Sequence, residues 1–154
     1  MLRVSYPILL APAYEANLLA HAIPFLVQPV PALLVCGTWY LAEMPGNPGR
    51  ILGCGGWTRA EPGGNSAPGD QSLAHLRHFA THPGCVRRGV GRTVFAQCVA
   101  DARAAGVRAF ESNSTFAAEP FYRALGFERL APTIVRLGEQ VDFPGVRMRL
   151  QLPA

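Results

Sequence analysis

The hydrophobic pattern changes period at Gly89, and this change limits the fold more than any other feature of the chain. Residues 72–81 read as a strand that ends at His82-Pro83-Gly84. Beyond Gly89, apolar residues recur every four positions, as on one face of a helix. They are Val90, Val94, Cys98 and Ala102. Gly106 is a natural stop for that helix, and residues 107–112 return to a strand pattern. The segment therefore predicts a right-handed βαβ unit.

The segments around this unit predict further strands and helices. Residues 38–43 and 51–58 read as two strands of a β-hairpin, because the turn-forming segment 44–50 separates them. Residues 2–10 are expected to form a first strand and residues 14–22 a short helix, and prolines prevent a long helix up to Val35. A second helix is expected over 115–125, with Thr115 or Ser114 as its N-cap. The closing strands are expected at 127–130, 133–137 and 146–152. These elements predict an α+β fold with a central mixed sheet.

Length and composition narrow the class of protein. The 154 residues suit a single domain, 1–154, with residues 61–70 as a flexible surface loop. No apolar run of about 18 residues occurs, so no membrane partner is expected. Four cysteines occur without a CxxC pair, which predicts neither a zinc site nor a redox motif and leaves buried thiols in a reducing, cytoplasmic compartment. They are Cys36, Cys54, Cys85 and Cys98.

The basic residues point to a phosphate-bearing ligand. All fourteen are arginines, and five of them fall between residues 77 and 103, where Asp101 is the one acid. Such a local patch favours a phosphate-bearing ligand. Nucleic acid is not the expected partner, because no Arg-rich block interleaved with aromatic residues occurs.

The turn before the predicted helix carries the chemistry. Gly89 and Gly91 stand at the start of the helix and are flanked by Arg87, Arg88 and Arg92. Glycine permits close approach of the backbone to an anion, helix N-termini present free N–H groups, and arginine adds bidentate donors. The segment is expected to hold a diphosphate, although a simple strand-to-helix turn with solvated arginines gives the same pattern. The segment is not a Walker A loop, because the lysine that such a loop requires is missing. It is not a dinucleotide-binding turn either, because the pattern GxGxxG is absent.

Two motifs in register carry a resemblance to a known family. Phe79-Ala80-Thr81-His82-Pro83, followed by Val86-Arg87-Arg88-Gly89-Val90-Gly91, resembles the acetyl-CoA signature of the GNAT N-acetyltransferases. The segment 120–127, Pro-Phe-Tyr-Arg-Ala-Leu-Gly-Phe, resembles the family's tyrosine helix. The resemblance covers the chain from about Thr38 onward and is poor over 1–35. The first signature position is Gln or Arg in the family and Val86 here; by the resemblance it acts through its backbone N–H.

The resemblance implies a GNAT-like three-layer fold and a function. The sheet would be mixed and mostly antiparallel, and its strands ending at Thr81 and Ser112 would splay around the pantetheine arm of acetyl-CoA. The activity implied is transfer of an acetyl group to a primary amine of a small molecule or peptide, by direct transfer in a ternary complex without a metal. Family members often form dimers, so a homodimer is one expected assembly. The implied cofactor-binding residues are Phe79, Ala80, Thr81, Val86, Arg87, Arg88, Gly89, Val90, Gly91, Arg92, Thr93 and Asn113.

Proton transfer needs a general acid and a general base, and the sequence offers candidates for both. By the resemblance Tyr122 is the general acid, because a phenol is protonated at pH 7 and can donate to a thiolate; the alternative is a tyrosine of the core. His75 is the candidate base, since strand alternation is expected to place His75, Arg77, Phe79 and Thr81 on one face; the alternative is a histidine with a purely structural role. Glu111 is another candidate base.

Two other functions stay open at this point. The same fold could serve as a non-catalytic acyl-CoA-binding or regulatory module that keeps the glycine turn. A nucleotide-binding protein could use the loop 84–93, with Glu111 as its magnesium carboxylate.

Overall fold

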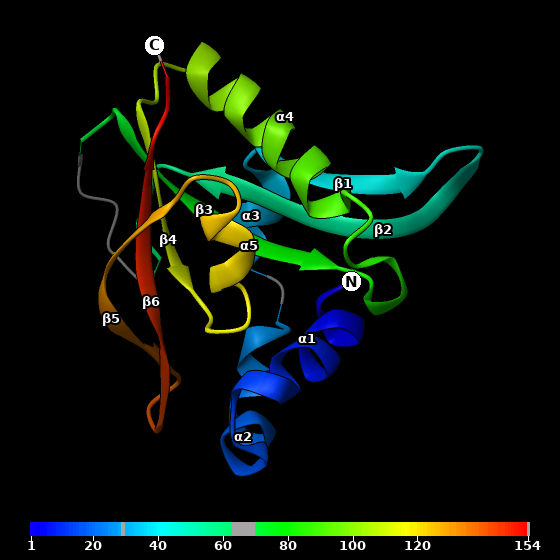
Figure 1. Ribbon diagram of the computed structural model, residues 1–154, viewed down its shortest axis with the longest axis vertical. Coiled ribbons are helices and arrows are strands. Elements are labelled where there is room, and N and C mark those ends of the chain that lie inside the picture. Colours follow the sequence, from blue (N-terminus) through cyan, green and yellow to red (C-terminus); the bar gives the residue numbers. More distant parts are fainter. Residues whose placement is uncertain (29, 63–69, 154) are drawn as a thin grey trace.

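A six-stranded sheet forms the centre of the molecule in the computed structural model, which describes residues 1–28, 30–62 and 70–153. The strand order is β1-β2-β3-β4-β6-β5 (Figure 1). Among the described strands, β3 and β4 form the one parallel pair and every other pairing is antiparallel. The bounds are Trp39–Met44 for β1, Asn47–Thr58 for β2, Leu73–Thr81 for β3, Ala109–Ser114 for β4, Glu128–Leu137 for β5 and Val141–Gln151 for β6.

The predicted βαβ unit is confirmed. Helix α4 (Val90–Ala104) connects the parallel strands β3 and β4, after a short 3-10 turn, η2 (Pro83–Cys85). Val94, Cys98 and Ala102 of the predicted stripe are buried, whereas Val90 is only partly buried. The β1–β2 hairpin is confirmed as well, with a turn shorter than the predicted one.

The main core lies between the sheet and the layer formed by α4 and by α5 (Glu119–Arg123). Phe110 and Met148 of the sheet are fully buried there, together with Trp57 and with Phe95 of α4. The aromatic rings of Phe95 and Phe110 pack directly against each other, with their centroids 6.2 Å apart. This layer fixes α4 and α5 against one face of the sheet.

The N-terminal segment forms the layer on the opposite face. It consists of α1 (Leu2–Leu10), the 3-10 turn η1 (Ala11–Ala13), α2 (Ala16–Leu26) and α3 (Pro31–Val35). Leu10, Leu19 and Ala22 pack on Phe143 of β6 in a second, smaller core. The three-layer α+β architecture expected from the family resemblance is thereby confirmed.

The strand predicted over residues 2–10 is wrong, because this segment is helix α1. Its apolar residues form a nearly continuous run, and a short run of that kind does not separate strand from helix by period. The predicted helix over 14–22 is observed as α2, which continues past Pro24 to Leu26.

The C-terminal part differs from its prediction at two places. The helix expected over 115–125 is reduced to α5, because residues 115–118 form a turn in which the Thr115 hydroxyl accepts the Ala118 N–H at 3.2 Å. The strands expected at 127–130 and 133–137 are one strand, β5, interrupted by a bulge. Pro132 is tolerated within it because β5 is an edge strand.

Two further findings concern the expectations about loops and membranes. Most of the loop expected at 61–70 lies outside the described residues. Among the helices that the structure describes, none combines the length and apolar character needed to cross a bilayer.

Candidate functional site

Strands β3 and β4 diverge soon after they begin. They pair through only three positions, Leu73 with Ala109, Ala74 with Phe110 and His75 with Glu111. Beyond these, β3 continues to Thr81 beside β2, and β4 continues to Ser114 beside β6. Figure 1 shows the two strands separating, with α5 over the gap and the N-terminal helices below its open end. The splay that the family resemblance implied is therefore present, and it leaves one side of the β3 backbone without a strand partner.

A β-bulge at His78 reorganises β3 along this gap. His78 has a φ of +47°, in the left-handed region that L-residues rarely adopt. Arg77 pairs with Gly56 and Ala80 pairs with Cys54, so His78 and Phe79 both stand opposite Gly55. The extra residue reverses the inward and outward alternation of the strand after Arg77.

The bulge places the candidate residues of β3 on two faces, and the expectation of one shared face is wrong. Phe79 lies over Gly55 on the α4 side, where a Cβ added to Gly55 would meet the Phe79 ring at 2.6 Å. Thr81 lies on the same side, near Gly91 of α4. In contrast, His75 pairs with Thr58, and Arg77 donates to the Thr58 hydroxyl at 3.3 Å, on the opposite face. Simple alternation missed this because nothing in the sequence marks the bulge.

The turn before α4 has the backbone geometry of an anion-binding nest. Arg87 has a φ of +63° and Gly89 a φ of +85°, separated by Arg88. Left-handed residues in such a turn direct successive N–H groups into one concavity. Within the described residues, the amides of residues 86–92 have no protein acceptor, and the first intrahelical bond is Thr93 N–H to Gly89 O at 2.9 Å. The predicted diphosphate cradle therefore has free donors.

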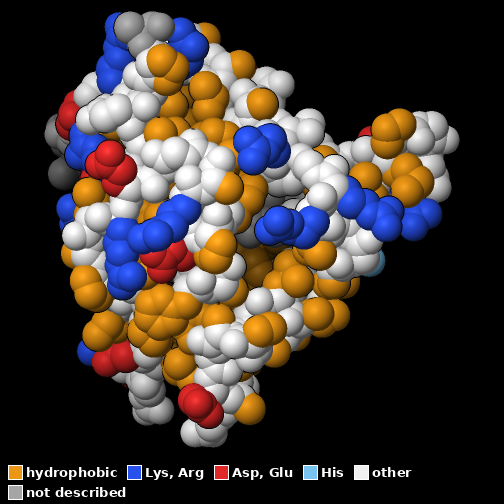
Figure 2. Space-filling model, viewed as in Figure 1, with side chains coloured by type: hydrophobic (Ala, Val, Ile, Leu, Met, Phe, Trp, Pro, Cys, Tyr) orange, Lys and Arg blue, Asp and Glu red, His pale blue; other side chains and the backbone are white. Residues whose placement is uncertain are grey.

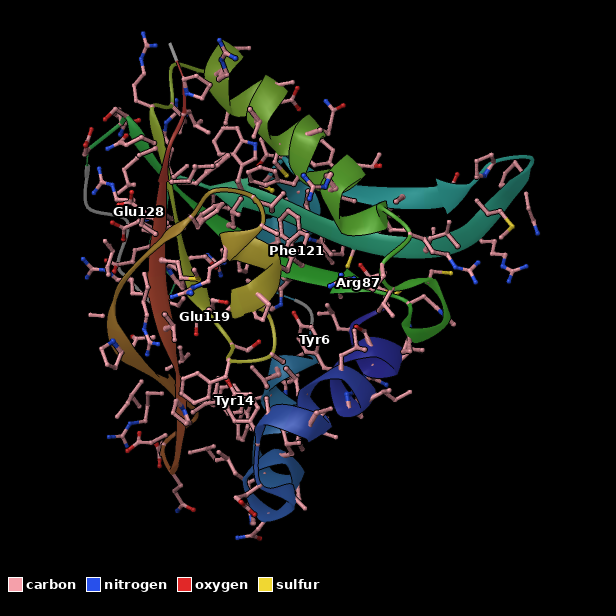
Figure 3. All side chains as sticks on the ribbon, viewed as in Figure 1. Tyr6, Tyr14, Arg87, Glu119, Phe121 and Glu128 are labelled. Atoms are coloured by element: carbon pink, nitrogen blue, oxygen red, sulfur yellow. The ribbon has the colours of Figure 1, made fainter. Side chains whose placement is uncertain are left out.

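Side chains around this turn fit the same role. Arg87, Arg88 and Arg92 are exposed and form no ion pair with any described acid. Figure 2 shows basic side chains beside a hollow with hydrophobic side chains below it, and Figure 3 shows Arg87 near the end of β3 and Phe121 beside α5. Val86 is 39% exposed, so its side chain has no packed role.

The cradle adjoins the gap between the diverging strands. Gly91 lies so close to Phe121 that an added Cβ would meet that ring at 3.1 Å, and Thr81 Oγ1 would be 3.6 Å away. The start of α4, the end of β3 and α5 consequently converge at one point.

Tyr122 is buried where α5 covers the gap. Its side chain is 5% exposed, and its ring contacts Phe79, Phe121 and Phe127 at centroid separations of 6.3, 5.2 and 5.2 Å. The hydroxyl is hydrogen-bonded to Ser112 of β4. Burial raises the pKa of Tyr122 to about 12, so its hydroxyl keeps its proton at neutral pH.

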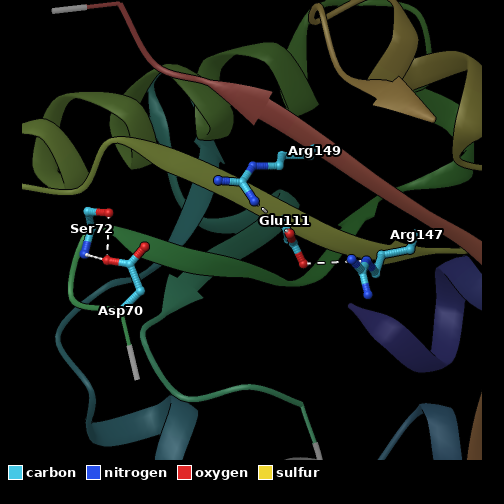
Figure 4. A network of polar contacts seen from close by, with 5 residues as sticks. All are labelled: Asp70, Ser72, Glu111, Arg147 and Arg149. Atoms are coloured by element: carbon cyan, nitrogen blue, oxygen red, sulfur yellow. Dashed lines mark hydrogen bonds and ion pairs between the residues drawn. The ribbon is translucent and has the colours of Figure 1, made fainter. Parts of the chain in front are cut away.

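His75 lies at the closed end of the gap, on the face opposite to the one that α4 covers. Burial lowers the pKa of His75 below its ordinary value of 6.5, although the carboxylates of Glu111 and Glu61 oppose the shift. Glu111 itself is buried and pairs with Arg149 at 3.3 Å and with Arg147 at 3.7 Å (Figure 4). Each carboxylate oxygen of Glu111 is therefore engaged by an arginine.

Asn113, predicted to contact the cofactor after the second strand of the βαβ unit, lies in β4. It is exposed on β4 and pairs with Arg147. By alternation it shares the face of Glu111, whereas Ser112 and Ser114 are buried on the other face. Among the described residues, no group of three or more metal-ligating side chains could hold a metal ion.

Tyr6 is the residue at the gap that sequence reasoning missed. Its hydroxyl donates to the Phe79 carbonyl at 3.5 Å, and it interacts electrostatically with Tyr122. The sequence offered no signal for it, because residues 2–10 read as a strand of uncertain partner.

Comparison with known proteins identifies this arrangement. Residues 36–129, more than half of the chain, match the model of the acetyltransferase (GNAT) domain. The chain belongs to the GNAT acetyltransferase family. A search of curated protein sequences found no match.

Solved GNAT structures share this fold. A GCN5-related N-acetyltransferase from Rhodopseudomonas palustris is 17% identical, with 98% of this chain and 85% of that chain covered at a TM-score of 0.71. A Mycobacterium tuberculosis protein in complex with CoA and NLQ is 18% identical, with 89% and 93% covered at a TM-score of 0.60. A putative acetyltransferase from Salmonella typhimurium, solved with acetyl-CoA, is 21% identical, with 80% and 69% covered at a TM-score of 0.58. This GNAT chain spans 61% of the length of a putative acetyltransferase from Exiguobacterium and 93% of that of the Mycobacterium tuberculosis protein.

Proposed function

We propose that the protein transfers an acetyl group from acetyl-CoA to a primary amine of a small molecule or peptide, by direct attack within a ternary complex. The observation that carries the proposal is the continuity between the amide-rich turn at Gly89 and the gap beside β3. The solved relatives with CoA and with acetyl-CoA support the identity of the donor.

The turn would bind the diphosphate of the cofactor. Free amides of residues 86–92 supply oriented dipoles, and Arg87, Arg88 and Arg92 supply charge and bidentate donors. The pantetheine arm would then lie along the unpaired side of β3. The backbone N–H of Phe79 or of Ala80 would polarise the thioester carbonyl, and the Ala80 N–H is directed toward the Cys54 sulfur. Phe79 N–H is therefore the better candidate.

Tyr122 would act as the general acid. As the amine nitrogen bonds to the acetyl carbon, the carbon–sulfur bond breaks and the thiolate of coenzyme A leaves. A protonated phenol beside that sulfur returns a proton to it. The raised pKa of Tyr122 keeps this proton available throughout the neutral range.

His75 would act as the base that takes the amine proton. Its lowered pKa keeps the imidazole neutral at pH 7, as an acceptor must be. Because His75 and Phe79 lie on opposite faces of β3, the acceptor amine would approach from the face opposite α4. An acyl-cysteine route is not supported, because burial raises the pKa of Cys98 to about 12 and Cys85 lies outside the gap, in η2.

Calorimetry and turnover together test the proposal. Acetyl-CoA and CoA are titrated into the protein, and release of free thiol from acetyl-CoA is then followed against a panel of primary amines. Binding followed by amine-dependent thiol release supports the acetyltransferase. Binding of CoA with no release for any amine supports a non-catalytic acyl-CoA module. Binding of ATP without binding of CoA supports the nucleotide-binding alternative and contradicts the proposal.

A further inference from the structure

The bulge in β3 is held by two side chains that approach it from different elements. The left-handed His78 carbonyl accepts the Cys54 thiol at 3.6 Å, and the adjacent Phe79 carbonyl accepts the Tyr6 hydroxyl at 3.5 Å. A strained backbone of this kind persists only where its surroundings determine it, and such residues gather at functional sites. The two carbonyls of the bulge are thus each fixed by a separate donor.

The Phe79 carbonyl points into the gap between β3 and β4. It belongs to the same trans peptide as the Ala80 N–H, which is directed toward Cys54 on β2. In a trans peptide the carbonyl and the N–H point in opposite directions. The Tyr6 hydroxyl therefore lies on the gap side of β3, where the thioester of the proposed donor would end.

Two phenols meet at this point from opposite layers. Tyr122 comes from α5, and Tyr6 comes from α1 in the N-terminal layer; Figure 3 shows Tyr6 below the gap that Phe121 flanks. The two hydroxyls are close enough to interact electrostatically. Burial is the largest cause that raises the pKa of Tyr6, so its hydroxyl remains a donor.

We infer that Tyr6 is a positioning residue for the acetyl donor: its hydroxyl holds the bulge so that the Phe79 amide meets the thioester carbonyl beside Tyr122. This inference rests on the proposed function. Tyr6 lies outside residues 36–129, which match the family model, so the N-terminal helix of this chain supplies the group.

Tyr6→Phe tests the inference, because it removes the hydroxyl and keeps the ring. Loss of one neutral hydrogen bond in the reacting geometry is expected to lower kcat roughly fivefold to tenfold. The affinity for CoA, measured by calorimetry, and the Tm should stay close to those of the unmodified protein. The stretching frequency of the carbonyl of bound acetyl-CoA, measured without acceptor, should move toward its value in free solution.

Tyr14→Phe is the matched control, since it removes a hydroxyl from the same N-terminal layer. Tyr14 donates to Pro144 O at 2.9 Å and accepts Phe116 N–H at 2.8 Å, so its loss tests docking of the layer without touching the bulge. It should lower Tm and leave the carbonyl frequency unchanged.

Each remaining outcome decides the inference. Tyr6→Phe with unchanged kcat and carbonyl frequency overturns it, and so does a variant that fails to fold or loses activity only in proportion to its loss of Tm. The proposed function is judged separately on the unmodified protein, which must bind acetyl-CoA and release thiol when an amine is supplied.

Discussion

His75 and Phe79 lie on opposite faces of β3. Residues four apart share one face of a regular strand, but the bulge at His78 adds a residue between these two. Phe79 faces α4 and α5 with Tyr122, whereas His75 lies on the other face of the sheet, beside Glu111 of β4. The bulge thereby separates the candidate acid from the candidate base by the thickness of the sheet.

Tyr122→Phe is expected to lower kcat roughly 100-fold, which is the low end of the contribution of a general acid. The affinity for CoA should change less than twofold, because the cradle is formed by other residues. Steady-state turnover and calorimetry measure the two effects. Turnover equal to that of the unmodified protein would remove Tyr122 from the mechanism.

Gly89→Ala and Gly106→Ala form a matched pair. Both glycines have a left-handed φ, +85° and +81°, and an added Cβ meets no atom within 4 Å at either. Each substitution is expected to destabilise the fold by about 1 kcal/mol, from backbone strain alone. Only Gly89→Ala should weaken CoA binding, because Gly106 ends α4 far from the turn at its start. Equal CoA affinities in the two variants, measured by calorimetry, would contradict the assigned cradle.

The pH dependence of kcat/KM tests His75. Because burial lowers its pKa, the acidic limb of the profile is expected below pH 6.5. In His75→Gln this limb should disappear while the residual rate stays flat. If the acidic limb of the variant's kcat/KM profile lies at the same pH as that of the unmodified protein, His75 is not the base.

The stability of the fold should show the same titration. Folded His75 binds a proton less readily than the unfolded chain, whose value is about 6.5. Its contribution is therefore complete above pH about 6.5 and is lost as the pH falls below that value. Urea unfolding of the unmodified protein and of His75→Gln, compared between pH 5 and pH 8, isolates this difference.

Glu111→Gln is expected to destabilise the protein by about 2 kcal/mol, because it leaves Arg149 beside an uncharged buried partner. This loss in the free energy of unfolding is smaller than that expected for a fully buried ion pair, because the side chains of Arg149 and Arg147 are 37% and 53% exposed. Asp142→Asn is the control: Asp142 pairs with Arg136 at 2.9 Å, but both side chains are more than half exposed. Its effect should stay below about 0.5 kcal/mol. Urea denaturation measures the free energy of unfolding of both variants. An equal decrease in the two variants would show that burial of Glu111 does not add to the stability of its ion pairs.

The sequence predicted the parts of the fold in which local pattern and tertiary structure agree. The stripe through Val94 and Cys98 marked α4, and Gly89 and Gly106 marked its ends. The turn before α4 could be predicted for the same reason, because its glycines, the helix start and the arginines are adjacent in the sequence, and its binding of a diphosphate stays a prediction. The expected homodimer and cytoplasmic location stay predictions.

The features that the sequence did not reveal depend on contacts between distant segments. The bulge at His78 is stabilised by Tyr6 and Cys54, which lie far from it in the chain. Residues 2–10 looked like a strand because a short, nearly continuous apolar run fits both a strand and a helix, and the segment contacts distant β3 as well as the neighbouring helix α2. Asn113 lies on the same face of β4 as Glu111, and its contact with the cofactor stays a prediction.

The Tyr14 hydroxyl joins three segments that are separate in the chain. Its ring is stacked between Phe116 and Phe143, and its one oxygen bonds both the turn that leads into α5 and the backbone of β6. A shift of the N-terminal helices must consequently break both bonds or carry the approach to α5 along with it. The position of the N-terminal layer and the start of the segment that leads to Tyr122 are thereby tied to the same oxygen atom.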